Sequence, residues 1–426
     1  MLCILAFLFF FNIHNKETSQ WSRKSKPFIS TKYRNYDKST PKTDLRDFCV
    51  APMTAPSTIK ANKISENLTL RLVQVVLRHG ARSPLSQFLP QGQRGNWICP
   101  SSLSYSEYST VFPLFDHSRR VHSVIDPRLS EYPPSCKLGD LLLEGFDELH
   151  QLGQKYREHY IEDLQFLPKD YFDSSLLYVH STNSRRSFDS AVSFTQGLYN
   201  PENPNEFLTI ETGGEQRDFY HVEANQCPEL LDQDHQFRAT DEYRNFVNAT
   251  KYKLKPVYDF LNISFDTTLE PATNSTEFMI LDNICDFLIP SFCNDKIYFP
   301  NETLYQNLTD TCFKFASYMM ANRYGHVNKG IAGSRSMREL NRLRNEFFSQ
   351  NDKVDHGGQG NGKKFQIISS HDSTIVSLLL LFTGDQFDPF TLTTPYGPPY
   401  ASHLTFETYE NVFSHKLYLR LIYNGQ

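Results

Sequence analysis

The stretch LRHGARSP, residues 77–84, places two arginines and a histidine within five positions at the end of an apolar run. The run is typical of a strand buried on both faces. Its apolar residues are Leu70, Leu72, Val73, Val75, Val76 and Leu77. Open α/β sheets hold their ligands at the carboxyl ends of the strands. We therefore expect Arg78, His79 and Arg82 to line a ligand site at the edge of such a sheet.

Two further segments repeat the order of apolar strand, polar loop and helix. LLYV at 176–179 leads into HSTNSRRSFDSAVSF, and FQIISSHDSTIVSLLLLF begins at Phe365. Their loops contain Arg185 and Arg186, and His371 and Asp372. Arginines that converge on one point repel one another unless an anion lies between them, and the guanidinium fork matches phosphate oxygens. The following helix N-termini also favour an anion. The pattern therefore predicts a phosphate site.

The same clusters contain the groups that phosphoryl transfer requires: a nucleophile, positive charge and a proton source. None of the clusters contains a cysteine. His79 can attack phosphorus through a neutral ring nitrogen, and nearby arginines keep it neutral by lowering its pKa. Asp372, at a helix entrance, is the candidate proton donor. Because a donor carboxyl acts in its protonated form, we expect an acidic pH optimum.

These segments resemble three motifs of the histidine acid phosphatases, the acid phosphatase and phytase branch of the histidine phosphatase superfamily. The matching stretches are RHGARSP, HSTNSRRSFDSA and SSHDSTIVSLL. GDLLLEGFDELHQLG, from Gly139 to Gly153, is similar to a helix of the family, and PPYASHLTFE resembles a segment of lysosomal and prostatic acid phosphatases. The resemblance spans about residues 69–426, in the family's order.

In that family the motif histidine is phosphorylated, the aspartate protonates the leaving group, and water hydrolyses the phosphohistidine. The resemblance thus implies an acid phosphatase acting on phosphate monoesters, with His79 as nucleophile and Asp372 as proton donor. The implied phosphate-binding residues are Arg78, Arg82, Arg186 and His371. The resemblance favours Arg186 over Arg185 as the phosphate-binding residue. It also implies a small phosphorylated substrate as partner and no metal or other cofactor.

The sequence departs from the family's pattern at three positions. His180 stands where many relatives carry arginine, and Glu144 replaces an apolar residue. His403 occupies a position that is cysteine in the mammalian enzymes, so at least one of their disulfides cannot form in the same way.

Two alternatives to a general acid phosphatase stay open. One is a specialised phosphatase for inositol polyphosphates or a phosphorylated sugar, which a pocket with many basic residues would favour. The other is a catalytically inactive, glycosylated binding protein built on the same fold. Intact His79 and Asp372 favour an enzyme over the second alternative.

We expect an α/β fold with a mixed, mainly parallel central sheet, helices on both faces, and a smaller, mainly helical lobe. Residues 68–200 and 364–426 should form the α/β core of a domain over 68–426, and residues 201–363 the lobe. The apolar spacing between 136 and 160 predicts a helix.

The N-terminus carries signals of export. Residues 1–13 form an apolar run of signal-peptide length, too short for a typical membrane span. Residues 14–67 are polar and interpreted as a flexible basic stem; residues 14–48 contain nine Lys and Arg against four Asp and Glu. We expect a secreted or lysosomal (vacuolar) protein, with membrane contact only if the apolar run is retained. The net charge of −5 argues against nucleic-acid binding.

The cysteines favour the same compartment. The chain has eight cysteines and no Cys-x-x-Cys pair, which argues against a zinc or redox motif and for disulfides. Removal of Cys3 with a signal peptide leaves seven, so one is free or pairs between chains, as in a homodimer. Six glycosylation sequons accompany them, at Asn67, Asn248, Asn262, Asn274, Asn301 and Asn307.

Overall fold

The computed structural model describes a defined part of the chain. The described residues are 45–54, 56, 67–85, 97, 99, 106–110, 119–123, 136–169, 173–199, 208–214, 218–222, 228–265, 275–296, 299, 301–326, 331–351, 362–383 and 397–426. The predicted signal peptide, most of the predicted stem, Cys3, Cys227 and Asn274 lie outside these residues.

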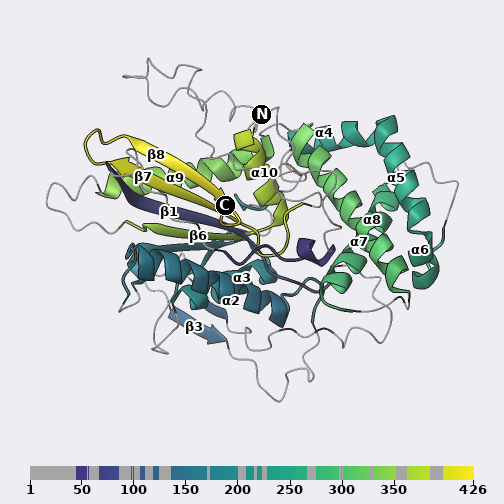
Figure 1. The fold of residues 1–426 in the computed structure, drawn as a ribbon, viewed down its shortest axis with the longest axis horizontal. Coiled ribbons are helices and arrows are strands. Elements are labelled where there is room, and N and C mark those ends of the chain that lie inside the picture. The colour runs from purple at the N-terminus through teal and green to yellow at the C-terminus, as the bar shows by residue number, and fades with distance from the viewer. Residues whose placement is uncertain are drawn as a thin grey trace.

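A six-stranded mixed sheet forms the centre of the molecule (Figure 1). Its strand order is β5-β4-β6-β1-β7-β8. The strands are β1 (Leu68–Arg78), β4 (Leu177–Ser181), β5 (Glu211–Thr212), β6 (Phe365–Ser370), β7 (His403–Asn411) and β8 (Leu417–Tyr423). The pairings from β5 to β1 are parallel, whereas β7 runs antiparallel to both β1 and β8. A separate antiparallel pair consists of β2 (Ser106–Thr110) and β3 (Arg119–Ser123).

Helices cover both faces of the sheet, because β1 buries side chains on alternate faces. Val75 belongs to the core beneath α2 (Leu143–Arg157) and α3 (Arg185–Leu198). Val76 belongs to the core beneath α9 (Ile331–Asn351) and α10 (Asp372–Thr383). Figure 1 shows α2 and α3 on one face of the sheet and α9 and α10 on the other. The predicted fold class, a mixed and mainly parallel sheet with helices on both faces, is confirmed.

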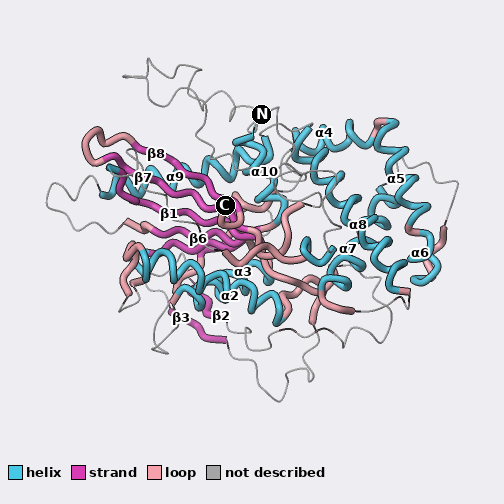
Figure 2. The backbone as a smooth tube through the Cα atoms, viewed as in Figure 1, coloured by secondary structure: helices cyan, strands magenta, loops and turns pink. Residues whose placement is uncertain are grey.

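A helical lobe lies beside one end of the sheet (Figure 2). Its helices are α4 (Pro228–Arg238), α5 (Asp241–Lys253), α6 (Lys255–Leu261), α7 (Ser275–Cys293) and α8 (Glu302–Ala321). They share an aromatic-rich core, and a Cys285–Cys312 disulfide joins α7 to α8. α9 falls within the range 201–363 that we expected to form the lobe, but its Leu340 packs on the sheet instead.

The described residues also include four short helical segments. They are η2 (Leu45–Phe48), η6 (Glu158–Asp163), η7 (Ser174–Leu176) and η9 (Asn322–His326). The helix predicted between 136 and 160 begins only at Leu143 and continues through η6. Its expected first turn is extended, because Leu141 forms a β-bridge with Arg82.

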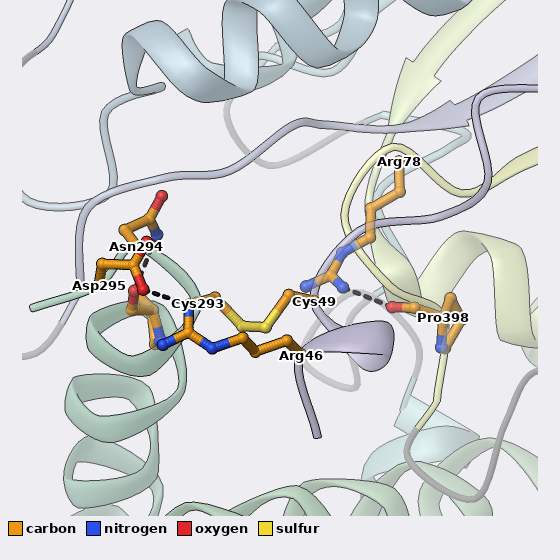
Figure 3. Close-up of a disulfide and its surroundings, with 8 residues drawn as sticks. Arg46, Cys49, Arg78, Cys293, Asn294, Asp295 and Pro398 are labelled. Atoms are coloured by element: carbon orange, nitrogen blue, oxygen red, sulfur yellow. Dashed lines mark hydrogen bonds and ion pairs between the residues drawn. A yellow bond between two sulfur atoms is a disulfide. The ribbon is translucent and has the colours of Figure 1, made fainter. Parts of the chain in front are cut away.

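The prediction of a flexible stem over 14–67 is wrong for residues 45–54. A Cys49–Cys293 disulfide fastens this segment to the end of α7, and Arg46 forms an ion pair with Asp295 beside it (Figure 3). The backbone of Cys49 and Ala51 is also hydrogen-bonded to Tyr400. A polar composition alone therefore misses a segment that a disulfide and backbone pairing hold in place.

Candidate active site

Three neighbouring parallel strands end at the same edge of the sheet. Arg78, the last residue of β1, is in register with Ser370 at the end of β6, and Ser181 at the end of β4 is in register with Ser369. The pairing extends past the strand ends, since His79 N donates to Ser370 O at 3.1 Å. This register brings the predicted site residues of three separate segments to one place.

His79 is buried and neutral at this edge. Its pKa is held well below the usual range by burial and then by Arg186, Arg78, His371 and Arg82. Nδ1 lies 2.9 Å from the carbonyl oxygen of Gly80. A carbonyl only accepts, so Nδ1 carries the proton, and the second ring nitrogen of a neutral imidazole keeps its lone pair.

Three arginines surround His79, and each has a buried Nε without a hydrogen-bond partner among the described residues: Arg78, Arg82 and Arg186. Arg78 Nη2 lies 2.7 Å from Asp372 Oδ2, and its guanidinium lies over the Tyr400 ring at 4.6 Å. It also donates to the Pro398 carbonyl (Figure 3). Buried donors of this kind require an acceptor, and three guanidinium groups suit an anion with several oxygens.

The two arginines at the start of α3 point to different partners. Arg185 is half-exposed and pairs with Asp189 one turn later, at 3.2 Å. Arg186 lies inside the site, where its Nη2 is 3.5 Å from His371 Nδ1. Burial, and then the charge of Arg82, lowers the Arg186 pKa to about 10. The structure thus places Arg186, and not Arg185, among the candidate phosphate ligands.

His371 and Asp372 lie where β6 ends and α10 begins. His371 Nε2 is 2.9 Å from Thr182 Oγ1, and burial followed by Arg186 holds the pKa of this histidine well below its usual range. The ring centroids of His79 and His371 are 5.6 Å apart. Asp372 Oδ1 accepts from Ser373 N at 2.8 Å, so its Oδ2 faces Arg78.

Sequence reasoning missed several residues that support the site. Asp286 on α7 accepts from Arg82 Nη2 at 2.6 Å and from Leu85 N at 2.6 Å. Glu148 on α2 accepts from Ala81 N at 2.8 Å. No motif in the lobe marks Asp286. Glu148 lies in the Gly139–Gly153 stretch that was compared with a family helix, but nothing in the sequence singled it out.

Two of the noted departures have structural partners. His180 forms a buried pair with Asp218 at 3.0 Å. Burial would raise the pKa of Asp218, but the bond to His180 outweighs it and lowers the value. His403 places its two ring nitrogens 3.1 Å from the carbonyl oxygens of Ala401 and Thr54. His403 therefore fixes the N-terminal segment without a cysteine at this position.

The fold is an α/β sheet that carries a buried histidine between arginines at the carboxyl edge of its parallel strands. A family model described as histidine phosphatase superfamily (branch 2) matches residues 69–424, and the chain belongs to this family. By class it is a phosphoric monoester hydrolase.

Similar proteins carry related names. Counting factor 60 of Dictyostelium discoideum is 24% identical and covers 89% of this chain and 84% of that protein. Lysophosphatidic acid phosphatase type 6 of Mus musculus is 23% identical, and the match covers 84% of this chain and 80% of that protein. A probable acid phosphatase of Schizosaccharomyces pombe is 24% identical, and the match covers 85% of this chain and 78% of that protein.

Among solved structures, the Hafnia alvei phytase in complex with tartrate is 16% identical, with a TM-score of 0.46, and covers 85% of each chain. At this level of similarity the substrate of that enzyme says nothing about the substrate here. Within the described residues, every helix is too short or too polar to cross a bilayer.

Proposed function

We propose that this protein hydrolyses phosphate monoesters through a covalent phosphohistidine on His79, with Asp372 as proton donor. The observation that carries the proposal is the hydrogen bond from His79 Nδ1 to the Gly80 carbonyl oxygen. It leaves the other ring nitrogen free to attack, in a setting where burial and three arginines keep the ring neutral.

In the first step, the free nitrogen of His79 attacks phosphorus and the bond to the leaving oxygen breaks. Asp372, as a carboxylic acid, gives its proton to that oxygen, so the alcohol leaves neutral and Asp372 becomes a carboxylate. Arg78, Arg82 and Arg186 offer their Nε–H groups to the phosphoryl oxygens as charge develops.

In the second step, water attacks the phosphohistidine. The Asp372 carboxylate takes the proton from the water, the phosphorus–nitrogen bond breaks, and neutral His79 is regenerated with release of phosphate. His371, beside both Arg186 and His79, adds a polar contact for the phosphoryl oxygens.

The charges around the site favour a substrate with a single phosphate over an inositol polyphosphate. On the lobe side, Arg82 already faces the carboxylate of Asp286. Arg323 and Arg238 both pair with Asp234. A second or third phosphate group would have to compete with these carboxylates for each cation.

Three disulfides among the described residues support export, since such bonds persist in oxidising compartments. They are Cys49–Cys293, Cys99–Cys136 and Cys285–Cys312. We therefore place the protein in the secretory pathway, with secreted and lysosomal destinations to be separated by locating the tagged full chain. Retention in the cytosol would contradict this placement.

The first experiment is hydrolysis of p-nitrophenyl phosphate by the full chain, expressed through a secretory route so that Cys49 can pair. We expect activity that peaks below neutrality and falls by at least roughly 1,000-fold in His79→Ala. A folded wild type without activity would overturn the proposal and favour the inactive binding protein, whose phosphate affinity would then be the quantity to measure.

The proton-donor role has its own test. Asp372→Asn should slow hydrolysis of alkyl phosphates, which have poor leaving groups, more than hydrolysis of p-nitrophenyl phosphate, whose phenolate leaves without a proton. Equal losses on both substrates would contradict the role of Asp372.

A further inference from the structure

Helix α2 touches the loop that carries His79 with backbone against backbone. A Cβ on Gly80 would lie 2.2 Å from Gly145 O, and a Cβ on Gly145 would lie 2.2 Å from Ala81 O. Only glycine fits at both positions. The backbone of the first turn of α2 therefore packs directly against the segment that connects His79 to Arg82.

One side chain of α2 is bonded directly to that peptide. Glu148 lies one turn after Gly145, and its Oε2 accepts from Ala81 N at 2.8 Å. The same loop is held on other sides by Leu142 N, which donates to Ala81 O at 2.9 Å, and by Ser190 Oγ, which accepts from Gly80 N at 3.2 Å. Of these three contacts, only the one from Glu148 involves an ionisable group.

We propose that Glu148 is a positioning residue, whose carboxyl fixes the peptide between His79 and Arg82 in the geometry that phosphate binding requires. The inference rests on the proposed function only in its use of turnover as a readout. Binding of inorganic phosphate reports on the same geometry without turnover. The residue touches the loop and not the substrate, so it acts through the placement of the loop.

Its charge state adds a dependence on pH. Burial raises the Glu148 pKa to about 8, against the opposing effects of the Ala81 N–H and Arg78. Glu144 and Asp147 on the same helix raise it further, and Tyr400 faces it from the segment before β7. Below this pH the carboxyl is neutral and the site keeps its full positive charge. As the pH rises through about 8, ionisation adds a negative charge near Arg78, which weakens phosphate binding.

Three variants of the full chain separate position from charge. Glu148→Gln keeps an acceptor for Ala81 N and cannot ionise, whereas Glu148→Ala removes the acceptor. Glu144→Gln is the control, because it removes an exposed carboxylate one turn away on the same helix. Each is measured by calorimetric binding of inorganic phosphate and by p-nitrophenyl phosphate hydrolysis, at about pH 5 and about pH 9, with urea unfolding to check the fold.

At about pH 5 we expect Glu148→Ala to weaken phosphate binding and to lower kcat/KM by roughly 10-fold. Glu148→Gln should stay within about 2-fold of the wild type, as should Glu144→Gln. At about pH 9 Glu148→Gln should bind phosphate roughly 3-fold or more tightly than the wild type at the same pH, because only the wild type carries the added charge.

Wild-type phosphate affinity in a folded Glu148→Ala would overturn the proposal, and so would an equal loss in the Gln and Ala variants at about pH 5. If Glu148→Ala does not fold, Glu148→Gln at about pH 5 decides: this variant keeps the acceptor for Ala81 N, so a loss of phosphate affinity of roughly 10-fold would overturn the positioning role. Identical affinities of Glu148→Gln and the wild type at about pH 9 would overturn the dependence on charge. Loss of turnover in the wild type with intact phosphate binding would count against the proposed function and leave this test in place.

Discussion

The sheet half and the lobe half of the site are built by different means. On the sheet, backbone register alone brings Arg78, Thr182 and His371 together, because β1, β4 and β6 are adjacent and parallel. From the lobe, the side chain of Asp286 contacts the loop that follows β1 (residues 79–85), where it accepts from Arg82 and from Leu85 N. The sheet therefore positions most of the candidate catalytic residues, and the lobe contacts one candidate phosphate ligand, Arg82.

The same contrast separates two arginines of the site. Arg82 faces the carboxylate of Asp286; burial alone would lower its pKa, but this pairing outweighs burial and raises the value. Arg186, supplied by the sheet half, has its pKa lowered to about 10 by burial and by Arg82. A buried cation that is disfavoured in the free protein gains the most when an anion arrives. Substitution of Arg186 should therefore have the largest effect and best tests the contrast between the sheet half and the lobe half.

Arg186→Met should lower kcat/KM for p-nitrophenyl phosphate by roughly 100- to 1,000-fold, because a donor to the developing phosphoryl charge is lost. The free energy of unfolding should stay unchanged or rise, since the change removes a buried charge. Steady-state kinetics and urea unfolding of the same preparation measure both effects.

The matched control for this change is Arg185→Met, next to it on α3. Its half-exposed guanidinium pairs with the buried carboxylate of Asp189 rather than with a candidate phosphate ligand, so activity should remain within about 2-fold of the wild type. Equal losses at the two positions would show that the helix, and not the ligand, is being disturbed.

The sheet half could be predicted from sequence because each of its parts is local. An apolar run followed at once by polar residues marks a buried strand and the site at its end, and this occurs before His79, before Arg186 and before His371. The order of the strands in the sheet needs long-range pairing, which no local pattern specifies. Even so, the mixed and mainly parallel architecture was within reach of the pattern and the family resemblance.

The lobe half could not be predicted in the same way. Asp286 lies on an apolar helix with no motif around it, and its partner Arg82 is 204 residues away. Cys49 shows the same difficulty, since its surroundings read as a stem while its partner Cys293 is 244 residues away. Contacts that depend on one side chain and on packing between distant helices leave no periodic signal in the sequence.

Removing the disulfide within the lobe tests whether the two halves are stabilised separately. Cys285→Ala with Cys312→Ala should lower the free energy of unfolding by about 3 kcal/mol, from the loop that the bond closes in the unfolded chain. Far-UV circular dichroism in urea, which follows the helices, should show the loss, whereas activity without urea should remain.

A comparable pair outside the lobe, Cys99→Ala with Cys136→Ala, is the control, since its loop of similar length should give a similar entropic loss. If the lobe unfolds on its own, the variant without Cys285 and Cys312 should lose helical signal at a lower urea concentration than that at which it loses activity. The variant without Cys99 and Cys136 should show no such separation. Coincident transitions in both variants would show that sheet and lobe unfold as one unit.

The smallest effect is expected at the contact between the halves. Asp286→Ala leaves Arg82 without its carboxylate and Leu85 N without its acceptor, which should loosen the loop that follows β1 and reduce kcat/KM by about 10-fold. Asp286→Asn keeps an oxygen acceptor and should lose less. Asp259→Ala removes an exposed carboxylate of the same lobe that pairs with Lys255, and should change nothing measurable.

The direction of the Asp286 effect decides what the lobe contributes. Asp286 both orders Arg82 and competes with phosphate for its charge, and the two effects have opposite signs. A fall in kcat/KM means that ordering dominates, because a loosely held guanidinium must give up conformational entropy when substrate binds. A rise would mean that competition dominates and that the lobe restrains a stronger phosphate site. Phosphate affinity of Asp286→Asn separates these outcomes, since the amide keeps the order and removes the competing charge.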